Sequence, residues 1–215
     1  MFFCHDAERA GFNGLSTGNL NINSITHARS GTEHRPTSVN AWLKENPEYA
    51  LRFADRAYKH LFNDGALTPE NGAAQWDARA QGIRLAMKAE SARWGDHVDS
   101  TPRTLEDFDR GLAREYNTWF PNRTPISIAQ FRDAGLYPDI DPPVFSQHGG
   151  KVPVGLGLLI TNETGDIYYT TDGNDPRLPG GGIHPNAVKI NGSKSDQTLI
   201  DAGALGWSYL DDGSD

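Results

Sequence analysis

One short stretch constrains the fold of this 215-residue chain more than any other, the run IYYTTDGNDPR at positions 167–177. Its first five residues are β-branched or aromatic, which are the side chains that suit a pleated, half-buried surface. Turn residues follow: glycine supplies positive φ, Asp and Asn bond the local backbone, and proline ends ladder pairing. The stretch therefore predicts a strand that leads into a tight structural turn, made of Asp172, Gly173, Asn174, Asp175 and Pro176.

A calcium site is the alternative interpretation of this turn. Asp172, Asn174 and Asp175 are spaced like the start of an EF-hand loop. Such a loop needs glycine at its sixth position and glutamate at its twelfth, where this chain has Arg177 and Ile183. The structural turn is therefore the interpretation we adopt.

Short strand-like runs continue on both sides of this stretch, at 144–145, 156–161, 187–190 and 198–200, and Gly, Pro and Asn separate them. This spacing is typical of a β-sandwich. Adjacent residues of a strand point to opposite faces, so one of Tyr168 and Tyr169 should be buried and the other exposed. An exposed tyrosine beside the glycines at 180–182 would offer a surface for a saccharide.

The first half of the chain carries helix signals instead. Asn46 before proline, Thr68 before proline, and Thr104 with Asp107 three residues later each predict a helix start. The first two helices should end at 63–65 and at Gly95. The second should carry an apolar core face made of Ala73, Trp76, Ala80, Ile83, Met87 and Trp94. The third should carry apolar residues as far as position 119, and a short fourth helix should cover about 126–134. Tryptophans at 76, 94 and 119 recur at core spacing, which favours packing over sugar stacking.

The change in pattern between the two halves predicts the domain organisation. A helical part covers 1–137, a proline-rich linker covers 138–142, a β part covers 143–203, and 204–215 reads as the start of a further, truncated domain. The expected fold class is α+β, with a helical segment followed by an immunoglobulin-like antiparallel β-sandwich. The apolar start MFFC resembles the middle of a domain, and 12–38 reads as a long irregular loop.

Composition excludes several classes of protein. A net charge of −8 argues against nucleic acid as a partner, because binding to phosphates requires a surplus of Lys and Arg. One cysteine, Cys4, permits no internal disulfide. The sequence contains no run of 18 apolar residues, so no membrane span is predicted, and this chain shows no signal peptide. The histidines at 5, 27 and 34 do not have the spacing of a closed zinc site.

The run at 167–177 resembles the signature of the chitobiase/β-hexosaminidase C-terminal-type module, also called a GH29D-like domain. It departs from the family pattern at Asn174 and Arg177. The resemblance implies an accessory β-sandwich fold and no hydrolysis, since fold alone does not give function.

Three stretches of the helical part are similar to the CotH kinase family in its bacterial multidomain form: FFCHDAE at 2–8, RFADRAYKHLFNDGALTP at 52–69 and AESARWGD at 89–96. The stretch RTPISIAQFRDAGLYP at 123–138 is also typical of such proteins just before their β-sandwich modules. The resemblance implies an atypical kinase fold that uses ATP and Mg²⁺. Asp6 matches the family's metal-binding position. Glu8 lies on the same face of an extended segment, so the two carboxylates could share a cation.

The chain also departs from the kinase pattern. Asp-Ala-Glu replaces the usual acidic motif, and no glycine-rich loop or phosphate-binding lysine precedes Phe2. We therefore expect no catalytic residue and no cofactor in this chain, with ATP and Mg²⁺ belonging only to a complete kinase parent.

The functional expectation is a non-catalytic structural or accessory fragment of a secreted bacterial multidomain protein, serving structure or adhesion outside the cell or at its surface. Its partners would be neighbouring domains, and cell-surface carbohydrate or protein. Two alternatives stay open at this point, namely part of a CotH-type ATP-dependent kinase and a carbohydrate-binding module.

Overall fold

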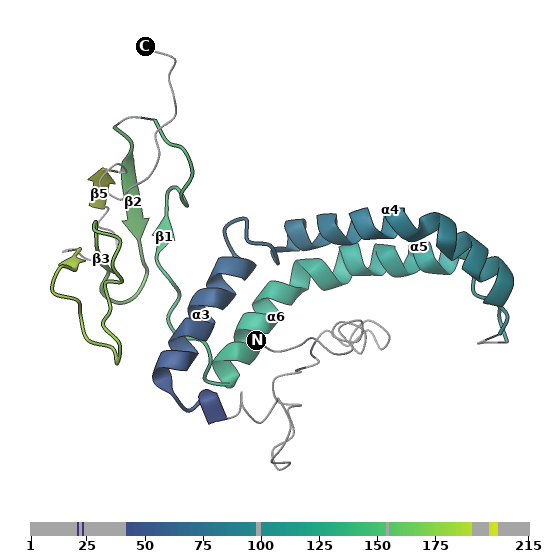
Figure 1. The fold of residues 1–215 in the computed structure, drawn as a ribbon, viewed down its shortest axis with the longest axis horizontal. Helices are drawn as coiled ribbons and strands as arrows, with labels where there is room; N and C mark the ends of the chain where they lie inside the picture. Colours follow the sequence, from purple (N-terminus) through teal and green to yellow (C-terminus); the bar gives the residue numbers. More distant parts are fainter. Residues whose placement is uncertain are drawn as a thin grey trace. The chain divides into compact units, whose positions relative to one another are not determined.

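The computed structural model describes residues 21, 23, 42–97, 100–153 and 155–190, and the backbone of 198–201. The chain divides into two compact units, 1–137 and 138–215. Helices make up the described part of the first unit, and strands and turns make up the second (Figure 1). Each unit has its own small core.

The first helix of the helical unit, α3 (Pro47–Leu61), begins where its capping residue predicts. The Asn46 side chain accepts a hydrogen bond of 2.9 Å from the Glu48 N–H, and Pro47 occupies the first turn. The chain leaves the helix through Asn63 and Asp64, both at positive φ. Asparagine and aspartate tolerate that conformation better than most residues, so the predicted stop is confirmed.

Two long antiparallel helical segments follow and form a hairpin (Figure 1). The first is α4 (Pro69–Trp94), capped by Thr68 and ending at Gly95, as the sequence predicts. The second runs through α5 (Leu105–Arg114), the π-helical segment η2 (Glu115–Trp119) and α6 (Phe120–Asp133) without a break. The capping box of Thr104 and Asp107 opens it.

The expected gap between a third and a fourth helix is therefore wrong. The helix continues through 120–125, although Pro121 and Pro125 each remove a backbone donor. Packing offsets this local cost. The rings of Trp76 and Phe120 meet edge to face, and Ile128 is buried against α3.

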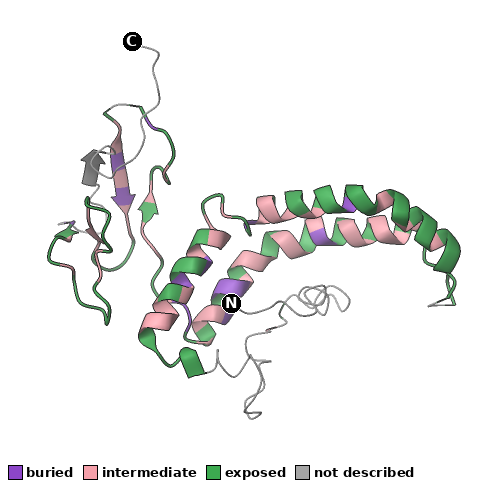
Figure 2. Ribbon diagram, in the orientation of Figure 1, coloured by how far each residue is buried: buried purple, intermediate pink, exposed green. Residues whose placement is uncertain are grey.

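The core of the helical unit lies between α3 and α6. Ala54 and Ala57 of α3 pack with Ile128 and Tyr137, and the rings of Phe53 and Phe131 meet edge to face at 4.9 Å. Burial is much lower along the hairpin, where exposed residues predominate toward the end of α4 (Figure 2). The predicted apolar face of α4 is thus only partly covered, with Ile83 49% and Trp94 47% exposed.

The second unit contains five short strands at the predicted places. They are β1 (Val144–Phe145), β2 (Gly157–Thr161), β3 (Tyr168–Tyr169), β4 (Val188–Lys189) and β5 (Thr198–Asp201). The strands form an antiparallel three-stranded sheet in the order β1-β2-β5 and an antiparallel pair β3-β4. On β2, Leu158 and Ile160 are buried and alternate with half-buried neighbours, the period expected of a strand.

This arrangement corrects the predicted fold class, because the described residues of 143–203 do not form an immunoglobulin-like β-sandwich. Among the described residues, strand accounts for 9% and helix for 49%. Three of the five strands have only two residues, and both residues of β4 are exposed. A sandwich needs two sheets with apolar inner faces. Among the described residues of this unit, the buried cluster consists of Leu158, Ile160 and Ile190, too few side chains to fill the space between two sheets.

Candidate binding groove

An apolar groove runs along the hairpin between α4 and the α5–η2 segment. Its volume is about 550 Å³, within the range of small-molecule sites. Apolar side chains from both helices form most of its wall, and charged groups lie around them. The lining residues are Trp76, Arg79, Ala80, Ile83, Met87, Asp107, Phe108, Gly111, Leu112, Arg114 and Glu115.

The groove follows from the periodicity of α4. Trp76, Ala80, Ile83 and Met87 recur at intervals of three and four residues, so they share one stripe of the helix. Ala80 is 5% exposed, whereas Ile83 on the same stripe is 49% exposed. The small side chains of Ala80 and Gly111 leave space in the wall that larger residues would fill.

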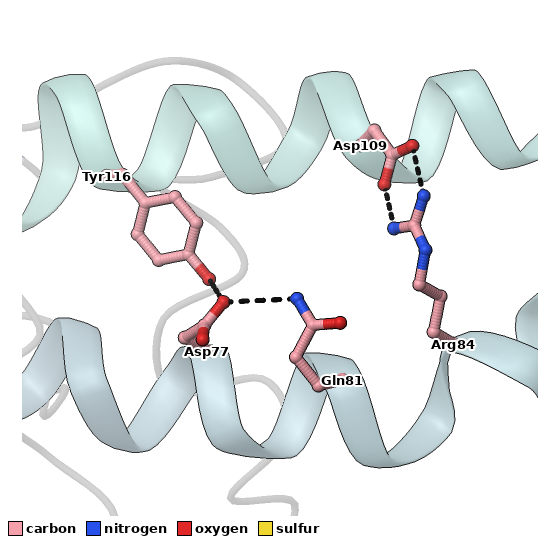
Figure 3. Close-up of polar contacts among 5 residues, drawn as sticks. All are labelled: Asp77, Gln81, Arg84, Asp109 and Tyr116. Carbon is pink, nitrogen blue, oxygen red and sulfur yellow. Dashed lines mark hydrogen bonds and ion pairs between the residues drawn. The ribbon is translucent and has the colours of Figure 1, made fainter.

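Asp77, Gln81 and Arg84 each follow a residue of this stripe by one position and form a second row on α4. Asp77 and Arg84 make polar contacts with the opposite helix (Figure 3). Arg84 binds the Asp109 carboxylate through both terminal nitrogens, with a distance of 2.7 Å from Nη2 to Oδ2. The Tyr116 hydroxyl donates to Asp77 Oδ1 at 3.2 Å, and Gln81 donates to the same oxygen. These bonds fix the axial register of the two helices.

That register sets the polar end of the groove. Since Tyr116 meets Asp77, the residues that precede them, Glu115 and Trp76, lie at nearly the same level of the hairpin. Both line the groove. Each also carries a buried polar atom, Trp76 Nε1 and Glu115 Oε2, for which the described residues supply no hydrogen-bond partner. Each of these two side chains of the groove lining thus has one unused polar atom, a donor on Trp76 and an acceptor on Glu115.

Glu115 is the most unusual side chain of the groove. It is the first residue of η2, and the residue as a whole is 4% exposed. Its Oε1 accepts from Nε and Nη2 of Arg114, both at 3.3 Å. Burial raises the pKa of the Glu115 carboxyl, and the bonds from Arg114 oppose that rise. A π-helical turn often marks a functional position in a helix.

The predicted structural turn belongs to the second unit, whereas the groove belongs to the first. Gly173 has φ of +79°, as its place in the turn predicts. Both oxygens of Asp172 accept bonds, Oδ1 from the Asn174 N–H at 3.0 Å and Oδ2 from the Asn186 side chain at 2.8 Å. Asp175 accepts from the Arg177 N–H at 2.8 Å. These internal donors occupy the carboxylates, and the pKa of Asp172 falls to about 2, chiefly because of Asn186.

The other candidate residues are placed as follows. Asp6 and Glu8 lie outside the described residues, as do Cys4, His5, His27 and His34. Tyr168 and Tyr169 are both half-buried, so the expected contrast between them is wrong. Tyr169 packs against the core, and the Lys189 ammonium lies 5.9 Å from the centre of the Tyr168 ring.

The described residues hold neither a cluster of metal ligands nor a membrane-spanning helix. Across 42–97, 100–153 and 155–190, His, Cys, Asp and Glu form no group of three or more that could hold a metal ion. No helix in the described part of the chain is long and apolar enough to cross a bilayer.

Sequence reasoning did not identify Glu115 and the groove. The spacing of Trp76, Ile83 and Met87 predicts a core face, and such a face is buried only if another element packs on it. The available signal was an acidic residue at the end of an apolar stripe, since Glu115 follows Phe108 and Leu112 at helical spacing. No sequence pattern predicts the π-helical turn that begins at Glu115.

Comparisons of the chain with protein-family models, with curated proteins and with solved structures gave no match. The two resemblances noted in the sequence therefore remain predictions.

Proposed function

We propose that this chain is a non-catalytic accessory part of a larger secreted protein, and that its helical unit is a binding module. The observation that carries the proposal is the apolar groove of about 550 Å³ between α4 and α5–η2. Its ligand would be an apolar group, either a small molecule or a side chain of a partner.

The exposure of the groove wall supports binding. Ile83 lines the groove and keeps 49% of its surface accessible. Covering an apolar side chain is worth about 25 cal/mol for each Å² removed from water. A ligand that covers Ile83, Met87 and Leu112 would therefore gain free energy without first opening a packed core.

The test is a titration with the neutral fluorescent probe N-phenyl-1-naphthylamine. We expect a saturable rise in fluorescence for the unmodified chain. Ile83→Asp should abolish it, because a charge placed in the wall opposes an apolar ligand. Leu85→Asp is the matched control, since Leu85 is on the same helix and 81% exposed but does not line the groove. The proposal fails if the unmodified chain shows no saturable binding, or if both variants lose it equally.

Calorimetric titration with ATP and Mg²⁺ distinguishes this proposal from a kinase. We expect no saturable heat, because phosphoryl transfer requires a phosphate cradle, a lysine and metal carboxylates together. Micromolar binding that disappears in Asp6→Asn would favour the kinase alternative instead.

A further inference from the structure

We propose that the groove binds a neutral apolar molecule that carries a hydroxyl group, and that this hydroxyl bonds both Trp76 and Glu115. The inference rests on the function proposed above and names the chemical class of the ligand.

The two unused polar atoms define what the ligand must offer. Trp76 Nε1 is only a donor, and Glu115 Oε2 is an acceptor when the carboxyl is ionised. Both are buried without a partner among the described residues, and both side chains line the groove at the same level. A buried polar group without a hydrogen bond is unfavourable, so a ligand that bonds both atoms gains more than its apolar contact alone.

Charge selects among the possible ligand groups. An ammonium group could donate to Glu115 but could not accept from Trp76, and the guanidinium of Arg114 already lies 3.3 Å from the same carboxylate. A carboxylate group could accept from Trp76 but would meet the buried charge of Glu115. A hydroxyl group donates one bond and accepts another, so it satisfies both atoms and brings no charge into the groove.

The remainder of the groove suits an apolar body. Ile83, Met87, Phe108 and Leu112 supply aliphatic, thioether and aromatic surface beyond Trp76. Methionine adapts its shape to irregular ligands and makes favourable contacts with aromatic rings. A fused aromatic or short alkyl skeleton with one hydroxyl at its end fits this combination.

Four naphthalene derivatives of similar shape test the inference, namely 2-naphthol, 2-methylnaphthalene, 2-naphthoate and 2-naphthylmethylammonium. Each is titrated into the full chain at pH 7 in two-dimensional ¹H–¹⁵N spectra, with the indole N–H signal of Trp76 assigned by its loss in Trp76→Phe. We expect 2-naphthol to bind about tenfold more tightly than 2-methylnaphthalene, as a hydrogen bond to a charged group allows. Its binding should move the Trp76 indole signal.

Two variants locate the source of that preference. In Trp76→Phe and in Glu115→Met, the affinity ratio of 2-naphthol to 2-methylnaphthalene should fall by most of the tenfold difference. Since the ratio is measured within each variant, a change in groove shape affects both ligands alike. Asn117→Ala is the control, because Asn117 is exposed on η2, close in sequence to Glu115, and does not line the groove. Circular dichroism of each variant checks that the helices are retained.

The outcomes separate this inference from the proposed function. Equal binding of 2-naphthol and 2-methylnaphthalene overturns the hydroxyl assignment and leaves the apolar groove in place. Tighter binding of the ammonium or the carboxylate also overturns it. Absence of binding by all four compounds, or sedimentation as a dimer that excludes them, overturns the inference and the proposed function together.

Discussion

The helical unit and the β unit of this chain reach their structures by different means. In the helical unit, three capped helix starts and regular apolar spacing specify long elements. In the β unit, strands of two to five residues are joined by turns, and all but one of the described glycines at positive φ lie there, Gly135 being the exception. Local signals therefore specify long elements in the helical unit and short ones in the β unit, and each unit leaves large apolar side chains exposed, such as Ile83 on α4 and Val188 on β4.

The largest expected effect is on the core of the β unit. Leu158 is completely buried on β2, and among the described side chains Ile160 and Ile190 share its buried cluster. Leu158→Ala should lower the free energy of unfolding by about 2–5 kcal/mol, since it removes transfer energy and leaves a cavity. We expect the amide signals of this unit to lose dispersion while helical circular dichroism at 222 nm persists.

Val144→Ala is the control for that variant, because Val144 is 61% exposed on β1. A simultaneous loss of the helical signal in Leu158→Ala would contradict the division into two units with separate cores.

A pair of glycine substitutions should act in opposite directions in the two units. Gly173 has φ of +79° and open space where a Cβ would lie. Gly173→Ala should therefore destabilise the fold through backbone strain alone, by about 1–2 kcal/mol. Gly82 also has open space but lies within α4, where Gly→Ala should stabilise by about 1 kcal/mol. Thermal unfolding of both variants checks the contrast, and a shift of the same sign in both would refute it.

A smaller effect is expected at Glu115. Burial raises the pKa of its carboxyl, so the folded state holds that proton more tightly than the unfolded state does. The contribution of Glu115 to stability is therefore greatest below its ordinary pKa and declines as the pH rises through the raised value. Glu115→Met lacks this decline and should be more stable than the unmodified chain by about 1 kcal/mol at pH 7.

The advantage of Glu115→Met should diminish when denaturation is repeated at pH 4. Glu90→Met is the matched control, because Glu90 is an exposed carboxylate on α4. If Glu115→Met proves less stable at pH 7, the carboxylate stabilises the hairpin through Arg114 and the expected sign is wrong.

The smallest effect concerns the turn at Asp172, whose carboxyl has a pKa of about 2. Because the folded pKa is lowered, the stability that this group contributes is present above its ordinary value and is lost as the pH falls toward 2. Asn186→Ala should move the titration midpoint of Asp172 upward, since the Asn186 bond is the main cause of the shift. Carbon-detected titration of the carboxyl measures it, and an unchanged midpoint would assign the shift to the Asn174 backbone instead.

Sequence alone predicted the elements better than their assembly. Asn46, Thr68 and Thr104 mark helix starts correctly, because a cap depends on residues only two or three positions away. The five strands were also located correctly, since β-branched runs between turn residues are local signals. The sandwich was wrong because strand pairing and the number of core-facing residues depend on contacts distant in sequence.

The binding groove shows the same limit. The apolar stripe of α4 is evident from its spacing, but whether a stripe is covered depends on the neighbouring helix. The small residues Ala80 and Gly111 open the space, and the register set by Tyr116 and Asp77 brings Glu115 level with Trp76. None of these relations follows from the residue types themselves.

The π-helical segment η2 has a consequence for how the second arm of the hairpin is used. Its bond from the Phe120 N–H to the Glu115 carbonyl spans five residues instead of four, which amounts to one extra residue in the turn. Each residue rotates an α-helix by about 100°, so everything after Trp119 is out of phase with what precedes it by that angle. One continuous arm thereby turns α5 toward the groove and α6 toward α3. Deleting a single residue from 115–119 would restore the phase and direct both halves of the arm to the same side.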